Sequence, residues 1–136
     1  MVILAFLISV ILLVLATIHM LWGFGYWFPM RDEADLVRAV VGAKDVDRMP
    51  GPIPCGLVSA LLLVVLIVLW SEPHWARTLI LGIAALAFIS RGMASYTVFW
   101  RKMTPQEPFA TYDRRYYGPL CVVLGMGVSA LQWGGF

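Results

Sequence analysis

The sequence predicts an all-α integral membrane protein, a bundle of four transmembrane helices that residues 1–136 form as a single domain. Hydrophobic residues make up 61% of the chain and charged residues only 13%. A soluble domain of this composition would expose large apolar patches. Four long apolar stretches alternate with polar connections, which is the pattern of a chain that crosses a membrane several times. A chain of 136 residues suits one domain.

The first apolar stretch predicts a helix over about residues 1–28. It carries no formal charge and is longer than the ~20 residues that a membrane helix needs. A secretory signal would begin with basic residues, whereas the first basic residue here is Arg31. We therefore expect a retained first helix, which Pro29 ends.

The polar connection that follows predicts a short helix over about residues 33–41. Asp32 is its expected N-cap, and Gly42 is expected at its end. Leu36 and the neighbouring valines would form an apolar side, so we expect this helix to lie on the membrane surface. The second membrane helix is predicted over about residues 53–70, where leucine and valine dominate.

The third helix is predicted over about residues 75–100 and carries Arg91 inside an apolar segment. The turn before it, residues 71–74, is short, so the second and third helices should be antiparallel neighbours. A guanidinium group is costly to bury in hydrocarbon, so Arg91 should face the interior of the bundle. The fourth helix is predicted over about residues 116–133, with Asp113 as its N-cap.

Basic residues predict the orientation of the chain in the membrane. Eight of them lie in the two long connections, after the first and third helices, and only Arg77 lies in the connection on the opposite side. The positive-inside rule therefore places both long connections in the cytoplasm and both termini outside. The net charge of +2 and the lack of a basic stripe argue against nucleic acid as a partner, and we expect membrane lipids instead.

The candidate site combines two polar residues that are expected at one depth. His19 lies nine residues before Phe28, and Arg91 lies ten residues before Arg101. At about 1.5 Å per residue, both would lie roughly 14 Å inside the cytoplasmic face. We expect them to share a polar cavity that suits an anionic or carbonyl-bearing ligand with an apolar tail. The other candidate ligand-binding residues are Trp22, Tyr26, Ser95 and Tyr96.

Structural roles stay open for the same residues, and two functional hypotheses follow. Arg91 could bond helix-end carbonyls and lock the bundle, Trp22 and Tyr26 could form an interfacial belt, and His19 alone is more simply structural. The first hypothesis is a binding protein, or a simple enzyme, that acts on a lipid-like molecule at the cavity. The second is a non-catalytic accessory subunit whose small-residue faces pack against a membrane-protein partner or a second copy.

The sequence contains no motif that names a reaction. His74 is expected at the outer end of the bundle, too far from the histidine of the first helix for both to hold one haem iron. Cys55 and Cys121 form no C-x-x-C pair and are expected to be free thiols. Asp113 is expected too near the surface to relay protons. We therefore expect no cofactor and no metal site.

Short motifs along nearly the whole chain carry a resemblance. They are His19-x-x-Trp22-Gly23, Val41-Gly42, Arg48-Met49-Pro50, Arg91 and Tyr112-Asp113-x-x-Tyr116-Tyr117-x-Pro119-Leu120-Cys121. Together they resemble a small bacterial membrane family catalogued as domain of unknown function 3995. The resemblance implies a four-helix protein of the bacterial cell (inner) membrane and supplies no activity. Members often carry an acidic residue one turn after the arginine of the third helix, where this chain has Ser95.

Overall fold

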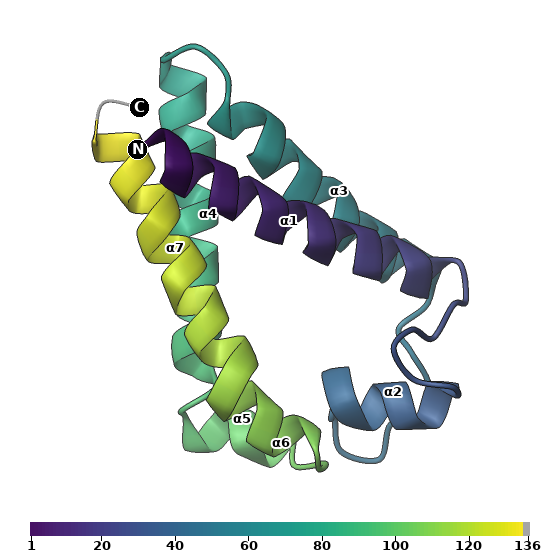
Figure 1. The fold of residues 1–136 in the computed structure, drawn as a ribbon. Coiled ribbons are helices and arrows are strands. Elements are labelled where there is room, and N and C mark those ends of the chain that lie inside the picture. The colour runs from purple at the N-terminus through teal and green to yellow at the C-terminus, as the bar shows by residue number, and fades with distance from the viewer. Residues whose placement is uncertain (135–136) are drawn as a thin grey trace.

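The computed structural model describes residues 1–134, which form seven α-helices and one π-helical turn, with no strand among them (Figure 1). The all-helical expectation is therefore confirmed for this part of the chain. The elements are α1 (Val2–Gly23), α2 (Glu33–Val40), α3 (Pro52–Leu69), α4 (Trp75–Ala94), α5 (Val98–Met103), α6 (Phe109–Tyr112), the π-helical turn η1 (Asp113–Tyr117) and α7 (Gly118–Trp133).

The long helices form two antiparallel pairs that diverge from one end of the molecule. α1 packs along α3, and α4 packs along α7 (Figure 1). The pairs meet at the end that holds the N-terminus, the turn between α3 and α4, and the end of α7. They separate toward the opposite end, where α2, α5 and α6 lie. The second and third long helices, α3 and α4, thus contact each other less extensively than each contacts its own pair partner.

The core lies where the two pairs meet. α1 contributes buried residues at helical spacing, including Ala5, Ile8 and Leu12, and α4 contributes Leu81 and Ala84. Small residues alternate with branched ones on these faces, so the helices approach closely without leaving voids. This core fixes the end of the molecule where the two pairs meet.

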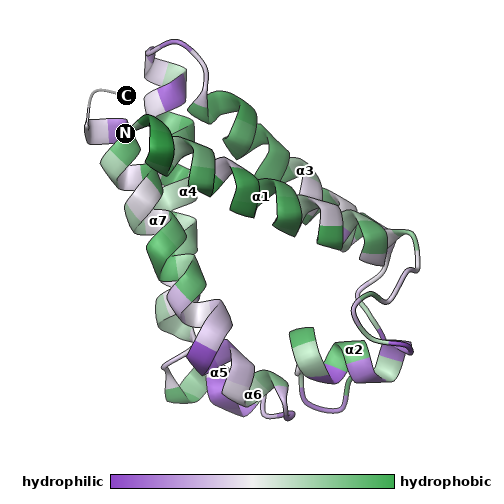
Figure 2. Cartoon of the chain, in the orientation of Figure 1, coloured by the Kyte–Doolittle hydropathy of each residue, from purple (hydrophilic) through white to green (hydrophobic). Residues whose placement is uncertain are grey.

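The outer faces of the long helices are apolar. Ile3 is 77% exposed and Ile53 is 81% exposed, and many other large apolar side chains share this exposure. Figure 2 shows apolar residues along the long helices and hydrophilic residues concentrated around α2, α5 and α6. Three helices, α1, α3 and α4, are long and apolar enough to cross a membrane. α7 has 16 residues, shorter than the ~20 that span a bilayer, but it continues the helical run that begins with α6.

Three helix boundaries differ from those that the sequence predicted. The first helix ends at Gly23, because the chain turns at the next two residues. Gly25 has a φ of +87°, which cannot continue a right-handed helix. The third helix ends at Ala94, because Thr97 caps a new helix by accepting a hydrogen bond from the backbone N–H of Trp100.

The helix predicted over residues 116–133 begins instead at Phe109, seven residues earlier. It runs without a break from α6 through η1 into α7. Asp113 therefore does not serve as an N-cap, since it lies one turn inside this run. The second membrane helix and the short helix after Asp32 agree with the expected ranges to within one residue. Asp32 accepts the backbone N–H of Asp35 at 2.9 Å, as an N-cap residue does.

The short helix α2 is packed inside the protein. Its apolar residues Leu36 and Val37 are fully buried, and α2 contacts α6. Gly42 follows α2 with a φ of +64° and lies so close to the ring of Phe109 that no Cβ would fit. Protein therefore covers Leu36 and Val37 on the apolar side of α2, whereas the position of α2 at the membrane surface stays a prediction.

Candidate functional site

The site is built around Asp113, the first residue of η1. Its carboxylate is fully buried and accepts hydrogen bonds from Arg91 Nη2 at 2.8 Å, Arg101 Nη2 at 2.9 Å and Trp100 Nε1 at 2.8 Å. We call these four residues the Asp113 cluster. Two guanidinium groups and one indole satisfy the carboxylate, which is what an ionised group needs when it is removed from water.

The aromatic rings of the same region complete the cluster. The guanidinium group of Arg91 lies over the ring of Trp100, 4.7 Å from its centroid, and that of Arg101 lies 5.5 Å from the centroid of Phe109. Arg101 also donates from Nη1 to the carbonyl oxygen of Ala110 at 2.7 Å. These contacts hold α5 against the start of the last helical run.

The Asp113 cluster corrects the depth that the sequence predicted for Arg91. Because Arg91 and Arg101 bind one carboxylate, their guanidinium groups lie side by side and are not separated by ten residues of helix. The break at residues 95–97 allows the chain to turn back in this way. Arg91 lies in the last turn of α4, so the ten-residue helical separation from Arg101, on which the predicted depth rested, is wrong. The side chain of Asp113 is 0% exposed, so it is a buried counter-ion of the two arginines.

Small residues bring α4 and the start of α7 close enough for this ion pair to form. Gly92 and Gly118 face each other across the two segments, and a Cβ at Gly92 would lie 2.6 Å from the carbonyl oxygen of Gly118. Ser95 is fully buried beside Gly118 and donates its hydroxyl to the carbonyl oxygen of Gly92 at 2.7 Å. Ser95 is therefore a packing residue as well as a lining residue of the pocket described below.

The candidate residues of the first helix make a separate group of contacts. His19 Nδ1 lies 2.7 Å from the carbonyl oxygen of Leu15, which only accepts, so Nδ1 carries the proton. The ring of His19 also contacts Trp22, with centroids 4.9 Å apart. Trp22 donates to the carbonyl oxygen of Phe28 at 2.7 Å, and Tyr26 is 65% exposed. These contacts stay within α1 and the loop after it, whereas those of Arg91 run to η1 and α5.

A surface pocket of about 490 Å³ lies beside the Asp113 cluster, where α4 ends and α5 begins. We call it the basic pocket. It is lined by residues 95–98, Arg101, Lys102, Pro105 and Arg114. The hydroxyl of Tyr96 donates to the backbone carbonyl of Arg114 at 3.1 Å and so ties two walls of the pocket together. Two of the six candidate residues, Ser95 and Tyr96, therefore line one cavity.

The cations of the basic pocket differ in how they are satisfied. Arg101 is bound to Asp113 and is mostly buried. Lys102 and Arg114 are exposed, and within residues 1–134 neither forms an ion pair. They are therefore free to bind an anion from outside the protein. Neither residue was predicted as a site residue, because in the sequence both are simply loop charges that indicate the orientation.

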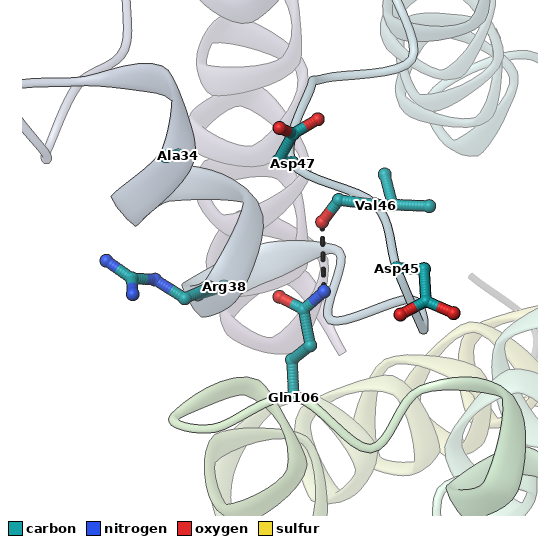
Figure 3. A pocket seen from close by; sticks show the side chains of 6 residues that line it. All are labelled: Ala34, Arg38, Asp45, Val46, Asp47 and Gln106. Atoms are coloured by element: carbon teal, nitrogen blue, oxygen red, sulfur yellow. Dashed lines mark hydrogen bonds between the residues drawn. The ribbon is translucent and has the colours of Figure 1, made fainter.

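A second surface pocket, of about 460 Å³, lies between α2 and the loop before α6 (Figure 3). Gln106 donates from Nε2 to the carbonyl oxygens of Ala43 at 2.6 Å and Val46 at 2.9 Å, which fastens the loop after α2. Arg38 extends away from Gln106, and the carboxylates of Asp45 and Asp47 point in different directions (Figure 3). The charged groups of this pocket do not converge, so it offers no defined ligand position.

Comparison with known proteins places the chain in a family. A family model described as "Protein of unknown function (DUF3995)" matches residues 12–128. The chain belongs to this family. The match confirms the resemblance drawn from the short motifs, and in this DUF3995 protein it includes both the Asp113 cluster and the basic pocket. No curated protein and no solved structure matches the chain.

The motif that carried the resemblance most specifically has a clear place in the structure of this DUF3995 protein. The residues from Tyr112 to Cys121 form the end of α6, the whole of η1 and the first turn of α7. Insertions of this π-helical kind are frequent at functional sites. Within residues 1–134, no group of three or more His, Cys, Asp or Glu side chains is placed to hold a metal ion.

Proposed function

We propose that this protein resides in a membrane and binds an anionic amphiphile, with the charged head group in the basic pocket. The observation that carries the proposal is the set of basic side chains that line one pocket at the end of an apolar helix. Basic pockets at the ends of transmembrane helices are a known means of holding anionic lipid head groups. The ligand class is the one that the sequence suggested, and the proposed site is the pocket at the end of α4 instead of a cavity shared by His19 and Arg91.

The charge around the pocket favours an anion. Arg91 and Arg101 share the single carboxylate of Asp113, which leaves one positive charge. Lys102 and Arg114 add two more. Four cations against one carboxylate thus leave three positive charges in the Asp113 cluster and the basic pocket together. Such a field attracts anions and repels cations.

Apolar side chains beside the pocket suit the tail of an amphiphile. Val98 lines the pocket and is 71% exposed, and Phe99 next to it is 72% exposed. Met103, one turn further along α5, is 42% exposed. α5 therefore turns apolar residues outward while Trp100 and Arg101 face the Asp113 cluster. An acyl chain that follows these residues would leave its head group within reach of the basic pocket.

A binding experiment tests this proposal. Native mass spectrometry of the purified protein in a neutral detergent would compare binding of phosphatidylglycerol, which is anionic, with binding of phosphatidylcholine. A juxtamembrane Lys or Arg contributes about 1 kcal/mol toward an anionic lipid, so Lys102→Gln with Arg114→Gln should weaken phosphatidylglycerol binding by about thirtyfold. The matched control is Arg31→Gln with Arg115→Gln, which removes two exposed charges outside the pocket. Equal binding of the two lipids by the unaltered protein would contradict the proposal.

We also propose that the end with α2, α5 and α6 lies in the cytoplasm and both termini lie outside. The eight basic residues of the long connections and the separation of the polar segments from the N-terminus support this orientation. Single cysteines introduced in a cysteine-free background at Gln106 and Glu72 would test it. In intact cells, an impermeant reagent should label the cysteine at position 72 and spare the one at 106. The reverse pattern would overturn the orientation.

A further inference from the structure

We infer that the head group which fits the basic pocket is a phosphate monoester, with two negative charges near neutral pH, in preference to a carboxylate or a phosphodiester with one. This inference rests on the proposed function and narrows it. Two observations support it: the surplus of positive charge at the pocket, and the hydroxyl groups of the pocket, which already donate their hydrogen bonds within the protein.

The charge surplus favours a dianion. Both oxygens of the Asp113 carboxylate are occupied, because Arg91 binds one and Arg101 and Trp100 bind the other. Lys102 forms no ion pair with Asp113, so its charge is not balanced by this carboxylate. A singly charged head group would leave two of the three positive charges unbalanced, whereas a dianion leaves one.

The hydroxyl groups of the pocket do not offer donors to a ligand. Ser95 donates to the carbonyl oxygen of Gly92 at 2.7 Å, and Thr97 donates to that of Ala94 at 2.8 Å. Tyr96 likewise uses its hydroxyl hydrogen within the protein. A neutral head group would therefore find few partners, and the free donors of the pocket are cationic.

The free cations reach the pocket from two different elements. Lys102 comes from α5 and Arg114 from η1. A phosphate monoester has three terminal oxygens, enough to accept hydrogen bonds from both side chains at once. The guanidinium fork of Arg114 can hold two of these oxygens while the ammonium group of Lys102 binds the third as a point charge. A carboxylate has only two oxygens, so no third oxygen is left for Lys102 when the guanidinium fork of Arg114 holds both.

The pH dependence of binding separates a monoester from a diester. A phosphate monoester loses its second proton with a pKa of about 6, so its dianionic fraction rises about fourfold from pH 5.5 to pH 7.5. The charged groups around the pocket are the cations Arg91, Arg101, Lys102 and Arg114 and the carboxylate of Asp113. Lysine and arginine side chains are cationic throughout this range, so the ligand is the group that titrates.

The test uses lipids with identical acyl chains in neutral detergent: phosphatidic acid (a monoester) and phosphatidylmethanol (a diester), with the matching fatty acid as the carboxylate. Binding is titrated by the rise in melting temperature that a ligand causes. Phosphatidic acid should bind at least tenfold more tightly than the other two at pH 7.5, and its affinity should fall up to about fourfold at pH 5.5. The affinity for phosphatidylmethanol should not change with pH.

The arms of the test separate this inference from the proposed function. Equal affinity for the monoester and the diester, or no change of monoester affinity with pH, would overturn the inference and leave anion binding intact. Failure of all three anions to bind better than phosphatidylcholine would overturn both. Inorganic phosphate alone distinguishes a free anion from a lipid head group, and saturation by it at the concentration of the lipid would contradict a lipid ligand. Lys102→Gln with Arg114→Gln should abolish the monoester preference, whereas Arg115→Gln should keep it.

Discussion

Neutralising the buried carboxylate should destabilise the protein strongly. In Asp113→Asn, the amide cannot balance the guanidinium groups of Arg91 and Arg101, which lie on either side of it. Removing one partner of a buried ion pair costs about 3–5 kcal/mol, because an unpaired charge is left in a poorly solvated site. The side chain of Arg91 is 34% exposed and that of Arg101 is 18% exposed, so water solvates part of each freed charge. We therefore expect a loss near the lower limit, about 3 kcal/mol.

The assay is reversible unfolding in mixed micelles of a neutral detergent and dodecyl sulfate, which reports the free energy of unfolding. Asp47→Asn is the matched control, because Asp47 is exposed and forms no ion pair within residues 1–134. It should change stability by less than about 0.5 kcal/mol. Adding Arg101→Gln to Asp113→Asn removes one of the two unpaired charges and should restore about 1 kcal/mol or more. A loss below about 1 kcal/mol for Asp113→Asn would refute the view that the carboxylate holds α4, α5 and η1 together.

Two further predictions concern packing and the attachment of α2. Gly125→Ala should destabilise by about 1–3 kcal/mol, because its Cβ would lie 2.8 Å from the carbonyl oxygen of Ala85 on α4. Gly56→Ala is its control and should be neutral or slightly stabilising, since nothing lies within 4 Å of that Cβ. Tyr117→Phe should cost about 1 kcal/mol by removing the 2.8 Å hydrogen bond to the carbonyl oxygen of Ala39. Burial is the main cause that raises the pKa of Tyr117, and the nearby Tyr112 and Asp113 raise it further. The stability that the protonated hydroxyl contributes is therefore complete below about pH 10 and declines as the pH rises further. Unfolding of each variant in the same micelles checks all three values, and a Gly125→Ala protein as stable as its Gly56→Ala counterpart would contradict the packing account.

The sequence predicted best the features that depend on local chemistry. The range of α3 follows from its run of leucine and valine, and the start of α2 follows from Asp32, whose side chain can cap a helix only at that point. The exclusion of charge from the first 28 residues predicted an apolar helix near the N-terminus. Such features need no knowledge of distant partners.

The features that the sequence did not predict depend on contacts between distant residues. No proline or glycine marks the break after Ala94, which is stabilised when Trp100 and Arg101 turn back to bind Asp113. Whether Asp113 is a surface cap or a buried counter-ion is decided by the arginine 22 residues earlier in the chain. One signal was present: Arg91 lies in an apolar helix with no acidic residue one turn away, so its counter-ion had to come from another segment.

The most direct test of the central claim is to locate the bound amphiphile by photocrosslinking. A phosphatidic acid with a photoreactive group near its head group would be added to the protein in neutral lipid nanodiscs, and labelled peptides identified by mass spectrometry. The account predicts labelling of residues 95–102 and of the peptide that contains Arg114, with competition by unlabelled phosphatidic acid. Labelling at His19, Trp22 and Tyr26 instead, or labelling that phosphatidylcholine competes equally well, would contradict it.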